Sequence, residues 1–263
     1  MYADYVSFFI QAKDLEKELG SIQNYLNKIQ SWATHWKFKF SVNKSNIVIF
    51  SHKRNPHKLT LTLNNTQIPI SNSQHFLGII FDSKLNWKKH LEYLNIKLER
   101  KVNILKILIN QNHYLNFKSI SLIFSSTIRS VYDYSFIPIL SSSISNLKPI
   151  KNTLNCIMRV ILGAFKSTPI PLLNIETGIE PIDHRAKYLL TSYICKIYSR
   201  FHHPMYTTCK NMITNNSIKW KPRSTPTIVK IKDFIINTYP DSLYLNPPES
   251  PVNLILLPGK SKA

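Results

Sequence analysis

One candidate metal ligand stands near the start of the chain, in the stretch Met1-Tyr2-Ala3-Asp4-Tyr5. Magnesium prefers oxygen ligands such as carboxylates. Enzymes that transfer phosphoryl groups gather carboxylates from several strands around two metal ions. Asp4 alone cannot hold two ions, and an isolated aspartate before a strand is more often a turn or capping residue. This position therefore indicates phosphoryl-transfer chemistry only if the rest of the chain supports it.

A second group of candidate residues is basic. The chain has 263 residues and a formal net charge of +20, from 34 Lys and Arg against 14 Asp and Glu. Such an excess favours an anionic partner, either a nucleic-acid backbone or, as the alternative, a membrane surface. Lys97, Arg100 and Lys101 are three and four positions apart, so they would share one face of a helix. Lys88 and Lys89 precede them, and we expect all five to contact nucleic acid without sequence preference.

The segment 184–232 contains no Asp or Glu and interleaves Lys and Arg with aromatic residues. That composition suits a single strand or a duplex backbone, although a solvated basic face is the alternative. Cys195, His202, His203 and Cys209 lie in the same segment. They lack the close Cys-x2–4-Cys pair of ordinary zinc fingers, and adjacent histidines rarely face one ion, so we do not expect a zinc site.

Composition also narrows the class of protein. Only 5 glycines are present, so no Gly-rich phosphate-binding loop is available. Three cysteines cannot all pair, which favours a reducing, intracellular compartment, nuclear or cytoplasmic. No apolar run is long enough to cross a bilayer. The apolar residues 1–10 are interrupted by Asp4 and lack a basic flank, so they make a poor signal peptide.

The elements that must position these residues change in character along the chain. Residues 14–36 carry apolar side chains at helical spacing and predict an amphipathic helix. Asn64-Asn65 predicts a turn between two short strands. Gly78 falls within one continuous predicted strand. The strands predicted over the first third of the chain cover residues 5–10, 47–50, 59–63, 68–70 and 75–81.

After Asp82 the apolar period becomes helical. Trp87, Leu91, Leu94, Leu98, Leu105 and Leu108 lie on one stripe, with Val102 beside it. Further helices are predicted over about 117–133, 145–163 and 183–201. Prolines accumulate from residue 219 onward and oppose long regular elements. The sequence therefore predicts an α+β chain in three parts: 1–83 mixed, 84–205 all-helical, and 206–263 a basic, Pro-rich and poorly ordered tail.

Three motifs follow one another in a fixed order: Tyr-Ala-Asp, then FKFSVNKSNIVIFS, then SQHFLGIIFDSKLNWKKHL. In order and spacing, residues 2–5, 36–51 and 76–91 resemble the palm of non-LTR retrotransposon reverse transcriptases, especially jockey-like elements. A looser similarity continues through IRSVYDY, GAFKSTPI and IETGIEPIDHR. The resemblance implies a partial palm of one helix and antiparallel strands in 1–83, followed by a thumb and connection region in 84–205. It also implies that the chain is the C-terminal part of such an enzyme, beginning at its catalytic hairpin.

The resemblance assigns roles by position. Asp4 would correspond to a metal-binding aspartate, and Lys44 to the lysine that can protonate the departing pyrophosphate. Without the family, Lys44 reads equally well as a solvated turn residue. Phe76, Leu77 and Gly78 would lie on the hairpin that holds the primer end. Gly78 would let another backbone approach closely, whereas Phe76 and Leu77 suit a core position better than a nucleic-acid contact.

The departures from the family predict lost catalysis. Tyr5 stands where the family has a second aspartate, so we expect Mg²⁺, the family's cofactor, not to bind well and the chain to be inactive as an RNA-directed DNA polymerase on its own. Nucleic-acid binding is expected to remain, no membrane is expected as a partner, and the sequence establishes no protein partner. The alternatives are a domesticated nucleic-acid-binding module without catalysis, a translated remnant without function, and a membrane-surface or protein-interaction module.

Overall fold

The computed structural model describes residues 6–11, 15–51, 59–111 and 115–214. The chain divides into two compact units, Met1–His90 and Leu91–Ala263. The division falls inside helix α2, whereas the sequence predicted a boundary between residues 83 and 84. Both helices and antiparallel strands are present, so the predicted α+β class is confirmed at that level. Asp4 and Tyr5 lie outside the described residues.

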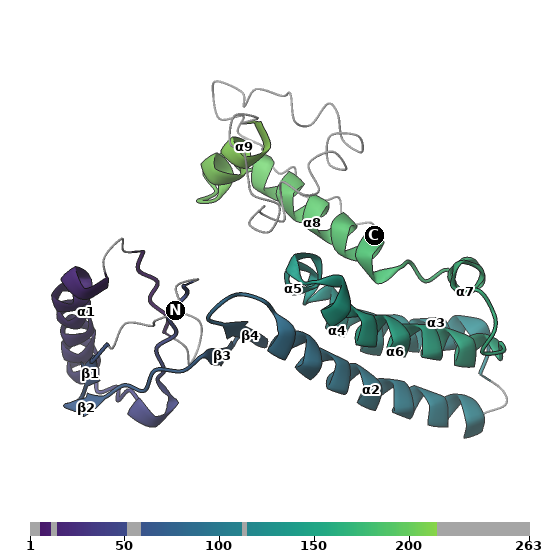
Figure 1. Cartoon of the computed structure of the whole chain (residues 1–263), viewed down its shortest axis with the longest axis horizontal. Helices are drawn as coiled ribbons and strands as arrows, with labels where there is room; N and C mark the ends of the chain where they lie inside the picture. Colours follow the sequence, from purple (N-terminus) through teal and green to yellow (C-terminus); the bar gives the residue numbers. More distant parts are fainter. Residues whose placement is uncertain (1–5, 12–14, 52–58, 112–114, 215–263) are drawn as a thin grey trace, which may run out of the picture. The chain divides into compact units, whose positions relative to one another are not determined.

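The first unit combines one long helix with two small antiparallel sheets (Figure 1). One sheet pairs β1 with β2, and the other pairs β3 with β4. A short 3₁₀ turn, Val42–Lys44, lies between the helix and the first sheet. The helix and strands are α1 (Leu15–His35), β1 (Thr62–Leu63), β2 (Thr66–Gln67), β3 (Ser73–Phe76) and β4 (Ile79–Asp82).

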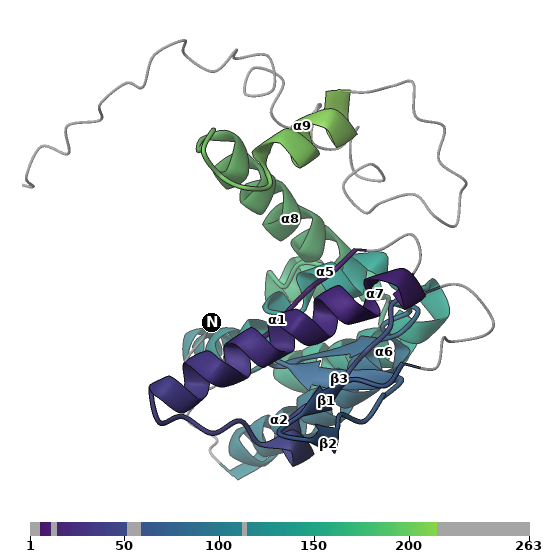
Figure 2. The ribbon, with the colours of Figure 1, turned by 90° about the vertical axis from the view of Figure 1, so that its left-hand side faces the viewer.

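Helix α1 packs on the first hairpin because its apolar stripe faces buried strand residues. Figure 2 looks at this unit with α1 toward the viewer and shows β1 alongside it. The Gln23 amide donates to the Thr62 carbonyl at 2.9 Å and accepts from the Thr62 N–H at 2.9 Å. The Gln23 side chain thus makes the two backbone hydrogen bonds at Thr62 that a neighbouring strand would otherwise make. The packed side chains are Leu19, Ile22 and Leu26 from the helix and Leu61, Leu63 and Ile68 from the hairpin.

Both hairpin turns use positive φ at their two central residues, as a type I′ turn requires. Asn64 and Asn65 have φ of 52° and 59°, which confirms the predicted turn there. Leu77 and Gly78 have φ of 47° and 81°. The prediction of one strand across residues 75–81 is therefore wrong. Gly78 lies at a hairpin tip because glycine tolerates this backbone conformation, not because it sits inside a strand.

Three other predicted strands do not form in the described residues, and in place of 68–70 the first hairpin returns through β2 at Thr66–Gln67. Residues 6–11 have no regular structure, and the side chain of Phe9 is 80% exposed. In the stretch 47–50, Ile47 makes a single parallel bridge with Ile70, and Phe50 is exposed. A strand is stabilised by hydrogen bonds to a neighbour, and here the neighbour is either absent among the described residues or one residue long.

The described part of the second unit is helical (Figure 1). Helix α3 runs through a π-helical turn, Phe124–Arg129, into α4, and together they cover the predicted helix 117–133. The helices α5 and α7 were not predicted. The helices are α2 (Lys88–Gln111), α3 (Phe117–Ile123), α4 (Ser130–Asp133), α5 (Phe136–Ser141), α6 (Ile144–Leu162), α7 (Ile170–Thr177), α8 (Ile182–Tyr198) and α9 (Tyr206–Thr214).

Helix α9 corrects part of the predicted tail. Residues 206–214, expected to be poorly ordered, form a helix whose Cys209 is buried and which packs on α8. The prolines that predicted an irregular tail begin only at residue 222, so they do not oppose this helix. The remainder of the predicted tail, 215–263, lies outside the described residues.

The core of the second unit is built on the leucine stripe of α2. Leu98 is fully buried, and Figure 1 shows α2 running alongside the layer that contains α3, α4 and α6. Gly163 and Gly178 end α6 and α7 in the left-handed conformation, each with φ of 63°. Side chains of this core include Leu91, Leu94, Val102 and Leu105 from α2, and Phe124, Ile128, Ile150 and Ile157 opposite. No helix of the described part is long and apolar enough to span a membrane.

Candidate nucleic-acid interface

The Asp82 carboxylate organises the loop between β4 and α2. Its Oδ1 accepts from the N–H groups of Lys84, at 3.1 Å, and Asn86, at 3.0 Å, and its Oδ2 accepts from Trp87 at 2.8 Å. Leu85 and Trp87 have φ of 50° and 62°, a strained conformation for these residues. Three hydrogen bonds to one charged group offset that strain. The FDSKLNW motif therefore forms a capped turn at the start of α2.

His90 joins the Phe-Leu-Gly hairpin to the first turn of α2. The imidazole is 1% exposed, and its Nδ1 accepts from the Ile80 N–H at 3.2 Å. Burial, with a smaller contribution from His75, lowers the pKa of His90 to about 4. The Lys89 ammonium also donates to the Ser73 hydroxyl at 2.9 Å. These contacts hold the hairpin on the helix, with the edge-on rings of Phe81 and Trp87 5.5 Å apart beside them.

The resemblance pointed to the hairpin but not to His90 or Asp82 as its supports. The available signal for His90 was its place three residues after Trp87 and one before Leu91, next to the buried stripe. A polar residue at such a position needs a hydrogen-bond partner. For Asp82, the signal was an acidic residue just ahead of a helical stripe.

The structure places the other candidates of the first unit as follows. Phe76 and Leu77 are half-buried, and Gly78 is exposed at the hairpin tip. Lys44 is exposed at the end of the 3₁₀ turn. The following segment is tied to β3 by Asn46, whose Nδ2 donates to the Gln74 Oε1 at 2.9 Å. Lys88 and Lys89 are exposed at the start of α2, and the Lys89 ammonium donates a hydrogen bond to the Ser73 hydroxyl.

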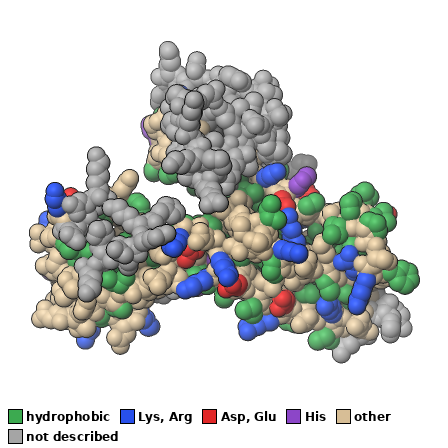
Figure 3. All heavy atoms as spheres, viewed as in Figure 1, with side chains coloured by type: hydrophobic (Ala, Val, Ile, Leu, Met, Phe, Trp, Pro, Cys, Tyr) green, Lys and Arg blue, Asp and Glu red, His purple; other side chains and the backbone are tan. Residues whose placement is uncertain are grey.

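Along α2, the basic candidates point away from the buried leucines. Lys97 and Arg100 are exposed, whereas Lys101 is half-buried at the edge of the core. Within the described part of the chain, no ion pair engages these three side chains. Figure 3 shows Lys and Arg side chains spread over this unit between apolar ones. The exposed apolar neighbours on α2 are Tyr93, Ile96, Ile104 and Ile107.

The looser motifs IRSVYDY and IETGIEPIDHR meet through an ion pair. The Arg185 guanidinium donates to both carboxylate oxygens of Asp133, with Nη2 to Oδ2 at 2.8 Å. Both side chains are about one-fifth exposed. Beside them, burial raises the pKa of Tyr132 to about 12. Lys151 and Asp183 form a second ion pair between α6 and α8. These motifs therefore hold the helices together.

No group of three His, Cys, Asp or Glu side chains among residues 6–11, 15–51, 59–111 and 115–214 could hold a metal ion. Of the residues considered for zinc, Cys209 is buried against α8. The His202 ring lies against Phe201, with ring centroids 3.9 Å apart. The His203 Nδ1 instead accepts from the Met205 N–H at 3.2 Å. The two adjacent imidazoles thus make separate contacts, one with an aromatic ring and one with a backbone N–H.

The low pKa of His90 makes stability depend on pH. Unfolding returns the imidazole to a pKa near 6.5, so the unfolded chain binds the proton more readily. Stability from neutral His90 is complete above pH 6.5 and is lost as the pH falls toward 4, by up to about 3 kcal/mol. Urea unfolding between pH 4 and 7.5 should show this loss in the wild-type chain and less of it in His90→Gln. His35→Gln, at an exposed helix end, should keep the wild-type profile; identical profiles for all three chains would contradict the role of His90.

Comparison with known proteins identifies relatives for part of the chain. It is 26% identical over 101 residues to a probable RNA-directed DNA polymerase from transposon X-element of Drosophila melanogaster, which covers 38% of this chain and 11% of that protein. The RNA-directed DNA polymerases from mobile element jockey of Drosophila melanogaster and Drosophila funebris are 25% and 21% identical over 115 residues, 44% of this chain. The chain spans only a small part, 11–12% in the matched regions, of these curated relatives. No family profile and no solved structure matches.

These matches show that part of the chain is similar to RNA-directed DNA polymerases of mobile elements. Within that class the relatives are polymerases of non-LTR retrotransposons of the jockey kind, which confirms the resemblance predicted from the motifs.

Proposed function

We propose that the described residues form part of the palm, the thumb and the following helices of a jockey-like reverse transcriptase, and that the chain binds nucleic acid without sequence preference. The observation that carries this proposal is helix α2. It has 24 residues, buries its leucine stripe, and directs Lys97 and Arg100 to solvent. The relatives are named RNA-directed DNA polymerases, and such enzymes act on nucleic-acid chains.

Phosphate contacts account for this binding better than base contacts do. Lys and Arg on a helix surface neutralise phosphates and release counterions, which strengthens binding at low salt. Base reading needs paired donors and acceptors that enter a groove, and the α2 face of Lys97, Arg100 and Lys101 offers only donors. Affinity should therefore be similar for different sequences and should fall steeply with salt.

The hairpin would then present a primer end next to the start of α2. In this proposal Phe76, Leu77 and Gly78 contact the terminal nucleotide, and His90 and Lys89 act as positioning residues that hold the hairpin. Gly78 at the tip leaves room for a nucleotide backbone, because it has no side chain. Lys44, exposed on its turn, would be the proton donor to pyrophosphate in a complete enzyme.

The described residues do not fit the two magnesium ions that polymerases use, so no catalytic step is assigned to them. A two-metal site needs several carboxylates. No group of three potential ligands exists in the described part, and Tyr5 follows Asp4 where a second aspartate is expected. We therefore propose that this chain is inactive as a polymerase on its own.

Primer extension on an RNA template, with Mg²⁺ or Mn²⁺, tests the loss of catalysis. Incorporation should equal that of a sample without protein, because one carboxylate cannot position two ions. The variant Tyr5→Asp should also be inactive, since a carboxylate from another strand is still required. Template-dependent incorporation that disappears in Asp4→Ala would contradict this proposal.

Fluorescence anisotropy with a labelled primer–template tests the binding itself. The chain should bind the duplex at low salt and release it as salt rises. Vesicles with anionic lipid provide the comparison, because a purely basic surface would bind both. Binding to vesicles and not to primer–template would replace this proposal with the membrane-surface alternative.

A further inference from the structure

The turn between α8 and α9 is closed by backbone hydrogen bonds. The His203 N–H donates to the Arg200 carbonyl at 2.8 Å, which makes Phe201 and His202 the central residues of a β-turn. The turn continues into α9 through the Tyr206 N–H, which donates to the His203 carbonyl at 2.8 Å. Edge-on packing of Tyr198 against Tyr206, with centroids 5.7 Å apart, ties the two helices together beside it.

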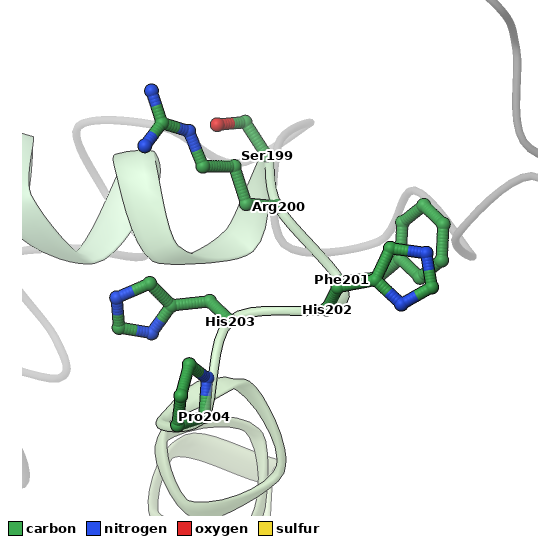
Figure 4. Close-up of a pocket in the computed structure, with 6 residues that line it drawn as sticks. All are labelled: Ser199, Arg200, Phe201, His202, His203 and Pro204. Carbon is green, nitrogen blue, oxygen red and sulfur yellow. The ribbon is translucent and has the colours of Figure 1, made fainter.

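This turn lines an open pocket of about 500 Å³, shown in Figure 4. The rings of Phe201 and His202 lie together on one side of the turn, and the Arg200 guanidinium and the His203 imidazole lie on the other. Phe201 is 39% exposed and Arg200 is exposed. The His203 Nδ1 accepts the Met205 N–H, so the neutral imidazole carries its proton on Nε2. The turn thus presents an aromatic surface on one side and cationic and N–H donor groups on the other.

That combination matches the chemistry of a nucleotide. A base has a flat π-face that stacks on exposed aromatic rings, and its phosphate accepts from guanidinium and imidazole N–H groups. Carboxylates that would repel a phosphate are missing from the sequence between residues 184 and 232. The backbone hydrogen bonds of the turn fix the backbone that carries these rings before binding, which reduces the entropy lost on binding.

We infer that the α8–α9 turn binds one unpaired nucleotide of a single strand, with the base on the Phe201–His202 rings and an adjacent phosphate at Arg200. This site differs from the α2 face, since it requires a base and not only phosphates. The inference rests on the proposed nucleic-acid binding for its partner. It adds that the chain engages an unpaired strand as well as a duplex.

Two labelled oligonucleotides of equal length and charge test the inference with the full chain. One is a thymidine strand of about ten nucleotides, and the other is the same strand with abasic sites throughout. Wild-type protein should bind the thymidine strand about tenfold more tightly in an anisotropy titration, a ratio typical of one stacked base. Phe201→Ala should remove this preference, and Arg200→Gln should weaken binding to both strands.

The chain offers a matched pair of control variants. Phe165 is 83% exposed and is followed by the exposed Lys166, outside this pocket. Phe165→Ala and Lys166→Gln should leave the preference at its wild-type value. Equal binding of both strands by the wild type would overturn the nucleotide site while leaving phosphate binding intact. Binding of neither strand would overturn the site, and the primer–template titration would then show whether the proposed function fails as well. An equal loss in Phe165→Ala would overturn the site too, because exposed aromatic rings in general would then be responsible.

Discussion

Leu98→Ala should destabilise the chain by about 2–5 kcal/mol in urea unfolding, the range for truncating a fully buried leucine. Leu98 is 0% exposed at the centre of the α2 stripe and belongs to the same buried cluster as Ile150 and Ile157. The substitution removes apolar contacts and leaves a cavity that close-packed neighbours cannot fill. Because α2 also carries the proposed interface, a loosened core should weaken nucleic-acid binding indirectly.

Ile104→Ala provides the matched control on the same helix. Ile104 is 60% exposed, so truncating its side chain leaves no cavity in the core. The expected change in unfolding free energy is within about 0.5 kcal/mol, as for most surface substitutions. Equal effects of the two substitutions would contradict the assignment of inner and outer faces to α2.

Replacing Lys97, Arg100 and Lys101 together by glutamine should weaken binding to primer–template by roughly 10- to 100-fold near 0.1 M salt. Each positive charge that contacts a phosphate releases counterions, and glutamine keeps a polar side chain without the charge. The loss should be the same for unrelated sequences, since phosphate contacts carry no sequence information. Circular dichroism should show an unchanged helix content, because Lys97 and Arg100 are exposed and Lys101 is half-buried at the edge of the core.

A matched triple variant separates local contact from net charge. Lys118, Lys148 and Lys166 are also exposed and lie outside the α2 face. Their joint replacement by glutamine removes the same total charge. It should reduce affinity much less than the α2 triple variant does. Equal losses would mean that the chain binds through its overall charge and not through α2.

Long helices were predictable because their signal lies in the local sequence. The stripe from Trp87 to Leu105 repeats over many turns, and the burial of Leu91, Leu94 and Leu98 follows it. Helix α1 likewise spans Leu15–His35, close to the predicted 14–36. The short helices α5 and α7 lack such repetition. Leu173 on α7 is fully buried, so packing on α6 stabilises this helix more than its own sequence does.

Strands were predicted less well because they depend on partners distant in sequence. The run Ile47 to Phe50 is apolar throughout, yet only Ile47 finds a bridge partner. At Gly78 the sequence showed a glycine between apolar residues but not which side of a turn it occupied. The type I′ geometry of Leu77-Gly78 depends on the pairing of β3 with β4.

The supports of the candidate site were hidden from the sequence for the same reason. Asp133 and Arg185 are 52 residues apart and appear in two separate motifs, and their contact depends on how α8 packs. The hydrogen bond from the Ile80 N–H to the His90 imidazole likewise requires the hairpin to lie against the first turn of α2. The residue types were visible, but the distances between them were not.

The salt dependence of primer–template binding tests the central claim most directly. Anisotropy titrations of the wild type and the α2 triple variant over a salt series give two slopes of log affinity against log salt. Because each neutralised phosphate contributes about 0.9 to the slope on duplex DNA, the triple variant should have a slope shallower by about two to three. An unchanged slope would mean that Lys97, Arg100 and Lys101 do not contact phosphate, and would contradict the proposed interface on α2.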